Sequence, residues 1–118
     1  MMSFIPKGYT NFESTGIFTN ESVPKVLLEP HYTRKGVYGQ VHVLNGHLKF
    51  FGYKNGTQSA EKEVLIKANE TAMAHPYYLH RLEPASEDLE FEIRFFSLAE
   101  PETNQTETES ETQMAKQK

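Results

Sequence analysis

Histidines have the widest chemical repertoire of the side chains in this sequence, and five of them are spread over 118 residues. A neutral imidazole is a common metal ligand and an acid–base group near neutral pH. His31 closes the segment Leu27-Leu-Glu-Pro-His31, where a β-rich run gives way to a loop ending in Gly36. His80 follows a proline turn in Pro76-Tyr-Tyr-Leu-His80. Rigid turns of this kind fix side chains at the mouth of a β-barrel, so both histidines are predicted to lie at a pocket mouth.

The last long β-rich run, residues 89–98, carries a second set of reactive side chains. It alternates apolar and polar residues, which places Glu90, Glu92 and Arg94 on one face. The two carboxylates are candidates to complete a metal shell begun by the two histidines, with Zn²⁺ or Fe²⁺ as the ion. Arg94 would oppose a metal and suits an anionic ligand. His42 faces away from the valines beside it, toward either solvent or a cavity, and is the other candidate for a ligand pocket.

The sequence lacks the residues or motifs that several kinds of chemistry require. The sequence has no cysteine, which removes disulfides, thiolate metal sites and cysteine nucleophiles. It also lacks a serine nucleophile motif, a Gly-rich phosphate loop and a His-Glu-x-x-His motif. For each histidine, a hydrogen-bonded structural role is the alternative to a functional one.

The elements that position these residues are predicted to be strands. Fourteen Phe and Tyr residues, interleaved with Val, Ile and Leu, favour pleated, half-buried surfaces. Runs at 37–44 and 47–53 flank Asn45-Gly46, a pattern that predicts a hairpin with a type I′ turn. A second turn at 54–57 returns the chain into a strand at 63–67. Further short β-rich runs lie at 26–29, 71–74, 79–83 and 89–98.

About seven to nine short strands with regular turns indicate a small antiparallel barrel, closed or nearly closed, or a sandwich. Residues 99–118 hold five glutamates, two lysines and no aromatic or branched aliphatic residue. Such a segment cannot offset its ordering entropy, so residues 1–98 are predicted to form the domain and 99–118 a disordered polar tail.

The charge and hydropathy of the sequence exclude some classes of binding partner. The net charge is −4, of which the tail holds −3, so the body is nearly neutral and has no basic stripe. Nucleic acid and anionic membranes are therefore not expected as partners. No basic-then-apolar leader and no apolar run of about 20 residues are present, and a cytoplasmic location is predicted.

Four blocks in order carry a family resemblance. They are His31-Tyr-Thr-Arg-Lys-Gly-Val-Tyr-Gly39, the segment 41–50, Pro76-Tyr-Tyr-Leu-His-Arg-Leu-Glu83 and the segment 88–96. Together with Pro24, they resemble the TehB/YeaR-like cupin domain of the tellurite-resistance family, over about residues 7–98.

The resemblance implies an all-β, cupin-type jelly-roll barrel of two antiparallel sheets with a pocket between them. In cupins the first motif supplies two histidines and a glutamate, and the second supplies one histidine. His31 and His80 match one histidine of each motif, whereas Thr33 and Gly39 stand near the positions of the missing ligands. In some relatives this domain precedes a methyltransferase domain dependent on S-adenosylmethionine. No Gly-x-Gly-x-Gly follows a strand here, so no such site is expected.

These residues and the family resemblance leave three alternative functions open. The first is a cupin-like protein that binds a small ligand, an oxyanion or a metal ion in stress resistance. The second is a metal-dependent cupin enzyme of the dioxygenase or isomerase class. The third is a non-catalytic interaction module, and a homodimer formed through edge strands is expected.

Overall fold

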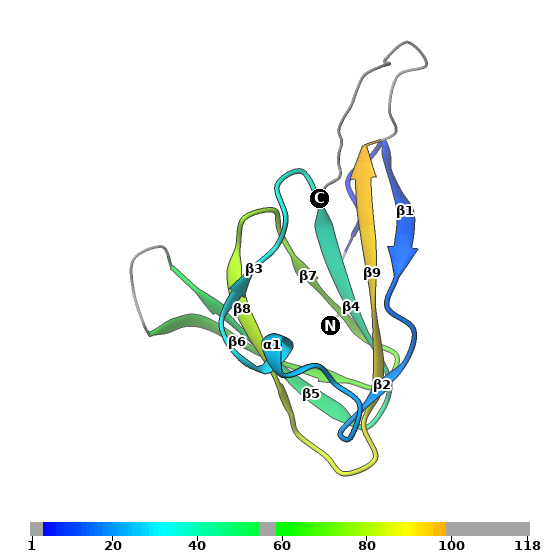
Figure 1. Ribbon diagram of the computed structural model, residues 1–118, viewed down its shortest axis with the longest axis vertical. Helices are drawn as coiled ribbons and strands as arrows, with labels where there is room; N and C mark the ends of the chain where they lie inside the picture. Colours follow the sequence, from blue (N-terminus) through cyan, green and yellow to red (C-terminus); the bar gives the residue numbers. More distant parts are fainter. Residues whose placement is uncertain (1–3, 55–58, 99–118) are drawn as a thin grey trace.

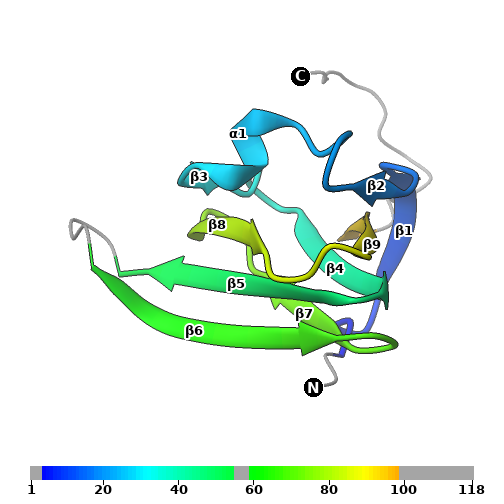
Figure 2. The same cartoon turned by 90° about the horizontal axis from the view of Figure 1, so that it is seen from below.

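The computed structural model describes residues 4–54 and 59–98, and in these residues the fold is all-β, with two antiparallel sheets and one short helix. The five-stranded sheet runs β1-β9-β4-β7, with β2 also paired to β9, and the four-stranded sheet runs β3-β8-β5-β6 (Figures 1 and 2). In chain order the elements are β1 (Tyr9–Ser14), β2 (Phe18–Thr19), α1 (Lys25–Leu28), β3 (His31–Tyr32), β4 (Tyr38–Asn45), β5 (His47–Tyr53), β6 (Ala60–Lys67), β7 (Thr71–Ala74), β8 (Leu79–Pro84) and β9 (Glu90–Leu98).

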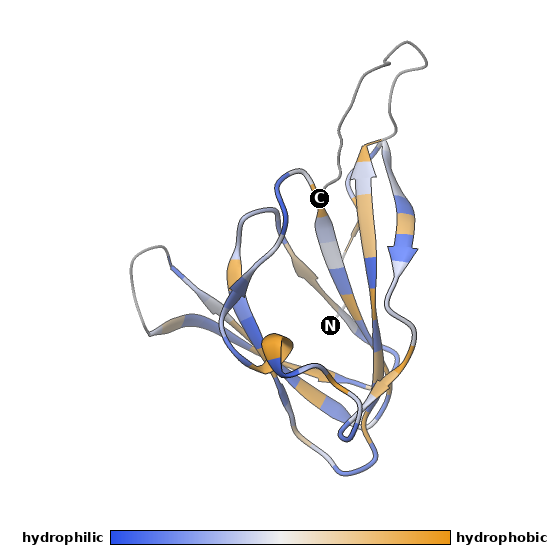
Figure 3. Ribbon diagram, in the orientation of Figure 1, coloured by the Kyte–Doolittle hydropathy of each residue, from blue (hydrophilic) through white to orange (hydrophobic). Residues whose placement is uncertain are grey.

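The core lies between the two sheets, because strands such as β5, β7 and β9 alternate buried and less buried side chains. From β4 and β9, Val41, Val43 and Phe91 face inward and are almost fully buried. Leu48 and Phe50 of β5 meet them from the other sheet. Figure 3 shows the same alternation as apolar and polar segments along the strands, with α1 largely apolar. The predicted division of residues 89–98 into an apolar and a polar face is therefore confirmed.

The closed barrel is not found. Within residues 4–54 and 59–98, no strand of one sheet pairs with a strand of the other. The sheets come together where β4 passes into β5 and diverge from that end (Figure 1). The all-β, two-sheet part of the prediction is confirmed, whereas full closure is wrong.

The Asn45-Gly46 hairpin is also wrong. β4 pairs with β7 and β9, whereas β5 pairs with β6 and β8, so the turn is a corner between the sheets. Gly46 has φ +76°, the left-handed conformation that favours glycine. The corner is tied to the loop before β9, because the Asn45 side chain donates to the Asp88 carbonyl at 2.9 Å. The positive φ expected at Gly46 is found, but the type I′ turn is wrong, because Asn45 does not have a positive φ and is the last residue of β4. The pairing partners are set by strands far along the chain.

Two other predictions have different outcomes. The run 26–29 was expected to be a strand, yet Lys25–Leu28 forms one turn of helix after Pro24, which has the extended φ and ψ of an N-cap. Leu27 of this helix packs against the core. The strand pair β5–β6 confirms the second hairpin, although most of its turn lies outside the described residues, as does the predicted tail at 99–118. No helix of the described chain is long and apolar enough to cross a membrane.

Candidate ligand-binding site

A cavity of about 360 Å³ lies between the two sheets, on the side where they diverge. Its wall is mostly apolar, with a few polar groups, which is the usual make-up of a small-molecule site. The lining comes from both sheets, from α1 and from the loop between β3 and β4. The lining residues are Glu13, Leu27, His31, Tyr32, Thr33, Arg34, Val37, Gly39, Val41, Ala74, His80, Ile93 and Phe95.

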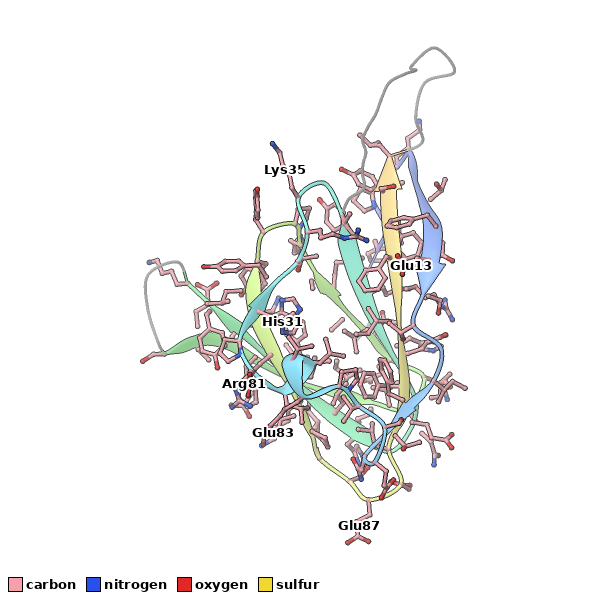
Figure 4. The ribbon with its side chains drawn as sticks, in the orientation of Figure 1. Glu13, His31, Lys35, Arg81, Glu83 and Glu87 are labelled. Carbon is pink, nitrogen blue, oxygen red and sulfur yellow. The ribbon has the colours of Figure 1, made fainter. Side chains whose placement is uncertain are left out.

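The structure brings His31 and His80 together in this cavity. They are cross-strand partners in the pairing of β3 with β8, and their ring centroids are 4.2 Å apart. The rings are tilted by 54°. His80 also stacks on the Phe50 ring, at 5.4 Å and 14°. Figure 4 shows His31 on the β3 side of the space between the sheets.

Both imidazoles are held in the same way by the backbone. His31 Nδ1 lies 2.9 Å from the Glu29 carbonyl, and His80 Nδ1 lies 2.8 Å from the Tyr78 carbonyl. Since a carbonyl oxygen only accepts, each Nδ1 must carry the hydrogen and donate it. In the neutral rings the lone pair is then on Nε2. Metal-binding histidines are commonly oriented by such a bond from the other ring nitrogen.

His80 is neutral at physiological pH. Burial lowers its pKa to about 4, the bond to the Tyr78 carbonyl opposes this shift, and nearby His31 adds to it. The side chain is 6% exposed. At pH 7 the buried His80 thus offers the pocket an uncharged Nε2 acceptor rather than a cation.

The turn between β7 and β8 fixes this geometry. Tyr77 has φ +60°, a strained value for a bulky residue, and its N–H donates to the Thr33 carbonyl at 3.0 Å. The Tyr78 carbonyl accepts from His80 and also, at 3.4 Å, from the Thr33 N–H. The Thr33 hydroxyl oxygen is buried and has no hydrogen-bond partner in the structure.

A β-bulge in β1 turns Glu13 toward the cavity. The register with β9 shifts between Asn11 and Glu13, so Glu13 pairs with Phe95, whose ring lines the pocket. The Asn11 amide holds the bulge by donating to the Glu13 and Phe95 carbonyls, both at 2.9 Å. Such bulges re-aim side chains beside functional sites. Without the extra residue, strict alternation would have pointed Glu13 outward.

Arg34, in the loop between β3 and β4, completes the rim. Its guanidinium lies 3.6 Å from the Glu13 carboxylate, and both side chains are more than half exposed. Sequence reasoning missed this pair. Arg34 lies in the first block of the family resemblance but carried no role there, and the bulge that aims Glu13 depends on pairing with a strand some 80 residues later.

His42, Glu92 and Arg94 form a separate cluster on the outer face of the five-stranded sheet. Arg94 donates to His42 Nδ1 at 3.1 Å and to one Glu92 oxygen at 2.9 and 3.1 Å. Ser14 donates to the other oxygen at 3.2 Å. Partial burial opposes ionisation of Glu92, but the bonds and charge of Arg94, with Ser14 and His42, outweigh it and lower its pKa. His42 and Arg94 are thus brought together, but they do not line the cavity between the sheets, and a ligand role for them stays a prediction.

The two candidate carboxylates do not reach the histidine pair. Glu92 is bound to Arg94 on the opposite face of β9 from Ile93, and Glu90 alternates onto that same face. Among the described residues, no group of three or more His, Asp or Glu is placed to hold a metal ion. The predicted four-ligand set of His31, His80, Glu90 and Glu92 therefore does not form one centre.

The fold and the pocket define a class: a small all-β protein of two facing antiparallel sheets, with a histidine pair in the cavity between them. A family model of the TehB-like domain matches residues 13–93, and the chain belongs to this family. The resemblance seen in the sequence is thereby confirmed.

Relatives found by sequence similarity support the same family assignment. Over 97 residues the chain is 34% identical to YeaR of Escherichia coli K12, an uncharacterized protein, covering 78% of this chain and 81% of YeaR. It is 26% identical over 85 residues to TehB of Haemophilus influenzae, named a probable S-adenosyl-L-methionine-dependent methyltransferase. That match covers 72% of this chain but only 30% of TehB.

Two crystal structures share the fold. One, of a protein from Escherichia coli K12, has a TM-score of 0.77 and 31% identity, and covers 84% of this chain and all of the other. The second is TehB from Haemophilus influenzae, with a TM-score of 0.72 and 25% identity, covering 78% of this chain and 32% of TehB.

Proposed function

We propose that this chain is a cupin-like binding protein whose pocket holds a divalent metal ion between His31 and His80, open to a small ligand. The observation that carries this proposal is the adjacency of the two rings, each tied to the backbone through the same nitrogen, Nδ1. Each Nδ1 is fixed by a backbone carbonyl, so the lone pair of each neutral ring is on Nε2, and both histidines line the cavity. Metal-binding histidines are commonly oriented by such a bond from the other ring nitrogen, and this is what supports a metal role for the pair.

The neutrality of His80 favours a cation over a bare oxyanion. A neutral Nε2 presents a lone pair, which repels an anion and attracts a metal ion or an N–H or O–H donor. Because the pKa of His80 is lowered to about 4, this holds throughout the physiological range. An oxyanion would therefore enter through a bound metal or through Arg34, rather than by direct contact with the histidine pair.

Imidazole nitrogens suit Zn²⁺ and Fe²⁺, the ions expected from the sequence. The donor set fits half of such a shell, and water or ligand atoms would fill the other positions. When bound, the ion would supply a Lewis acid to an incoming ligand. The chain's own residues orient the imidazoles, keep His80 neutral and line the cavity with mostly apolar walls.

The alternative is a metal-dependent cupin enzyme using the same pocket. Glu13 favours it, since this carboxylate lines the cavity and is a candidate base. The methyltransferase name belongs to TehB, of which this chain matches less than a third, and methyl transfer is not proposed here. Turnover of small substrates with added Fe²⁺, Mn²⁺ or Zn²⁺ would favour the enzyme.

Metal binding is tested by titrating the metal-stripped full chain with Co²⁺ and measuring its visible absorption, with Zn²⁺ content from elemental analysis. The test variant is the double substitution His31→Gln and His80→Gln. The matched control is His47→Gln, an exposed histidine at the start of β5. The wild type and the control should bind stoichiometric metal, and the double variant should bind none.

Circular dichroism checks that each variant folds. Should the double variant fold and bind as much metal as the wild type, the proposal is wrong. A folded double variant without metal, beside a control that retains it, supports the proposal.

A further inference from the structure

We infer that Arg34 binds the carboxylate of the pocket's ligand, a small organic monocarboxylate with an apolar body. The Glu13 carboxylate competes with this ligand for the Arg34 guanidinium. The inference deepens the proposed function and rests on it, because it names the ligand class of the same cavity. It adds a second anchor point at the rim, away from the histidine pair.

The structure already shows a carboxylate in this position. Arg34 meets the Glu13 carboxylate at 3.6 Å across the cavity mouth, which joins the loop after β3 to the edge strand β1. Of the described residues that line the cavity, Arg34 is the one Arg or Lys and Glu13 the one Asp or Glu. A planar guanidinium matches the geometry of a carboxylate, and such pairs can form two parallel hydrogen bonds.

The existing ion pair is easily displaced. Both side chains are more than half exposed, and exposed pairs of this kind contribute at most about 1 kcal/mol. In contrast, the turn at residues 34–37 fixes the position of the Arg34 backbone. The Val37 N–H donates to the Arg34 carbonyl at 3.2 Å, and Gly36 takes φ +74° in the turn. The guanidinium also lies 5.7 Å from the centre of the Phe12 ring.

The other lining residues favour an apolar group on the part of the ligand that is not the carboxylate. Val37, Val41, Ile93 and Phe95 present apolar surface in the lining that also holds the rim pair and the histidines. A phosphate or a dicarboxylate would place extra negative charge beside Glu13 or over these apolar walls, at an unfavourable desolvation cost. A single carboxylate on an apolar body satisfies the rim and the wall together.

The experiment measures binding of benzoate, and of its neutral counterpart benzamide, to the metal-free full chain by calorimetry or by NMR titration. Benzoate should bind more tightly than benzamide. Arg34→Gln should weaken benzoate binding about tenfold, the effect of losing a charge-assisted hydrogen bond. Glu13→Gln should strengthen it by up to about fivefold, because the competitor is gone.

Lys35→Gln is the matched control. Lys35 neighbours Arg34, but it does not line the cavity and projects outward from the loop (Figure 4). Its loss should leave benzoate affinity nearly unchanged. Equal weakening by the Arg34 and Lys35 variants would mean general electrostatic attraction, and equal binding of benzamide would remove the carboxylate preference. Weakening by both the Arg34 and Glu13 variants would mean a structural role for their ion pair. Any of these three results overturns the inference.

Failure of this inference is distinguishable from failure of the proposed function. Cobalt titration of the same variants reports on the histidine pair alone and should be unaffected by Arg34→Gln. Lost benzoate selectivity with intact cobalt binding would sink only the carboxylate site. Absent cobalt binding with benzoate effects as predicted would sink only the metal.

Discussion

Acidification should destabilise the fold through His80 before most carboxylates titrate. The pKa of His80 in the folded chain is lowered to about 4, mainly by burial, from its ordinary value of 6.5. Well above pH 6.5 the ring is neutral in both the folded and the unfolded chain, so it adds no pH dependence there. Between pH 6.5 and about 4 the unfolded chain binds a proton that the folded chain does not. Stability therefore falls as the pH falls through this window.

The size of the effect follows from that difference. A gap of about 2.5 pH units at 1.36 kcal/mol per unit gives a loss of roughly 3 kcal/mol by pH 4. The 6% exposure of His80 means that solvent screening reduces this figure little. Because a small domain has only about 5–15 kcal/mol of stability, the loss should be readily measured.

The assay is urea unfolding of the metal-free protein at several pH values, followed by far-UV circular dichroism, since the chain has no tryptophan. Wild type is compared with His80→Gln, which retains Glu92 and the other acids and lacks only this proton site. The difference between their unfolding free energies should shrink by roughly 3 kcal/mol from pH 7 to pH 4. His47→Gln is the control and should follow the wild type. Parallel curves for wild type and His80→Gln would refute the assignment of the acid sensitivity to His80.

Three further predictions concern the fold and its assembly. Gly46→Ala should cost roughly 2–4 kcal/mol, because the left-handed φ strains alanine and its Cβ would clash with Ser86 and lie 2.9 Å from the Leu89 Cα. Gly16→Ala, at φ +78° with open space around it, should cost only the backbone strain of about 1–2 kcal/mol, and equal losses in urea unfolding would contradict the steric account. Asn11→Ala should cost about 1 kcal/mol by removing both bonds that hold the β1 bulge, and unchanged stability would show that the bulge needs no such support. The chain is expected to be a homodimer formed through exposed edge strands, and light scattering that gives a monomer mass at high concentration would contradict this.

The strands were largely predictable because period-two alternation is a local signal. Residues 71–74 and the apolar face of 89–98 were placed correctly, as was the β5–β6 hairpin. Which sheet a strand joins was not predictable, because it depends on pairing with strands far away in the sequence. Gly46 allows a sharp change of chain direction in a hairpin or at a corner, and the pairing of β5 with β8 and β6 rather than with β4 makes it a corner. The same holds for Val26–Leu28, whose apolar side chains suit a strand or one helical turn.

The site was predictable only in part, for the same reason. His31 and His80 were singled out by their turns and by the family resemblance, but their meeting depends on the register of β3 with β8. Glu92 was expected near them because it is a carboxylate on a polar face, and that face turned out to be the outer one. Glu13 entered the pocket through a one-residue bulge, which no spacing rule reveals.

The central claim is a metal ion held between His31 and His80, and anomalous diffraction from crystals of the full chain grown with Zn²⁺ tests it most directly. The account predicts a zinc peak in the cavity, about 2.0–2.1 Å from Nε2 of both histidines, with each Nδ1 still donating to its backbone carbonyl. A peak at other residues alone, or the two rings seen with no zinc between them, would contradict it.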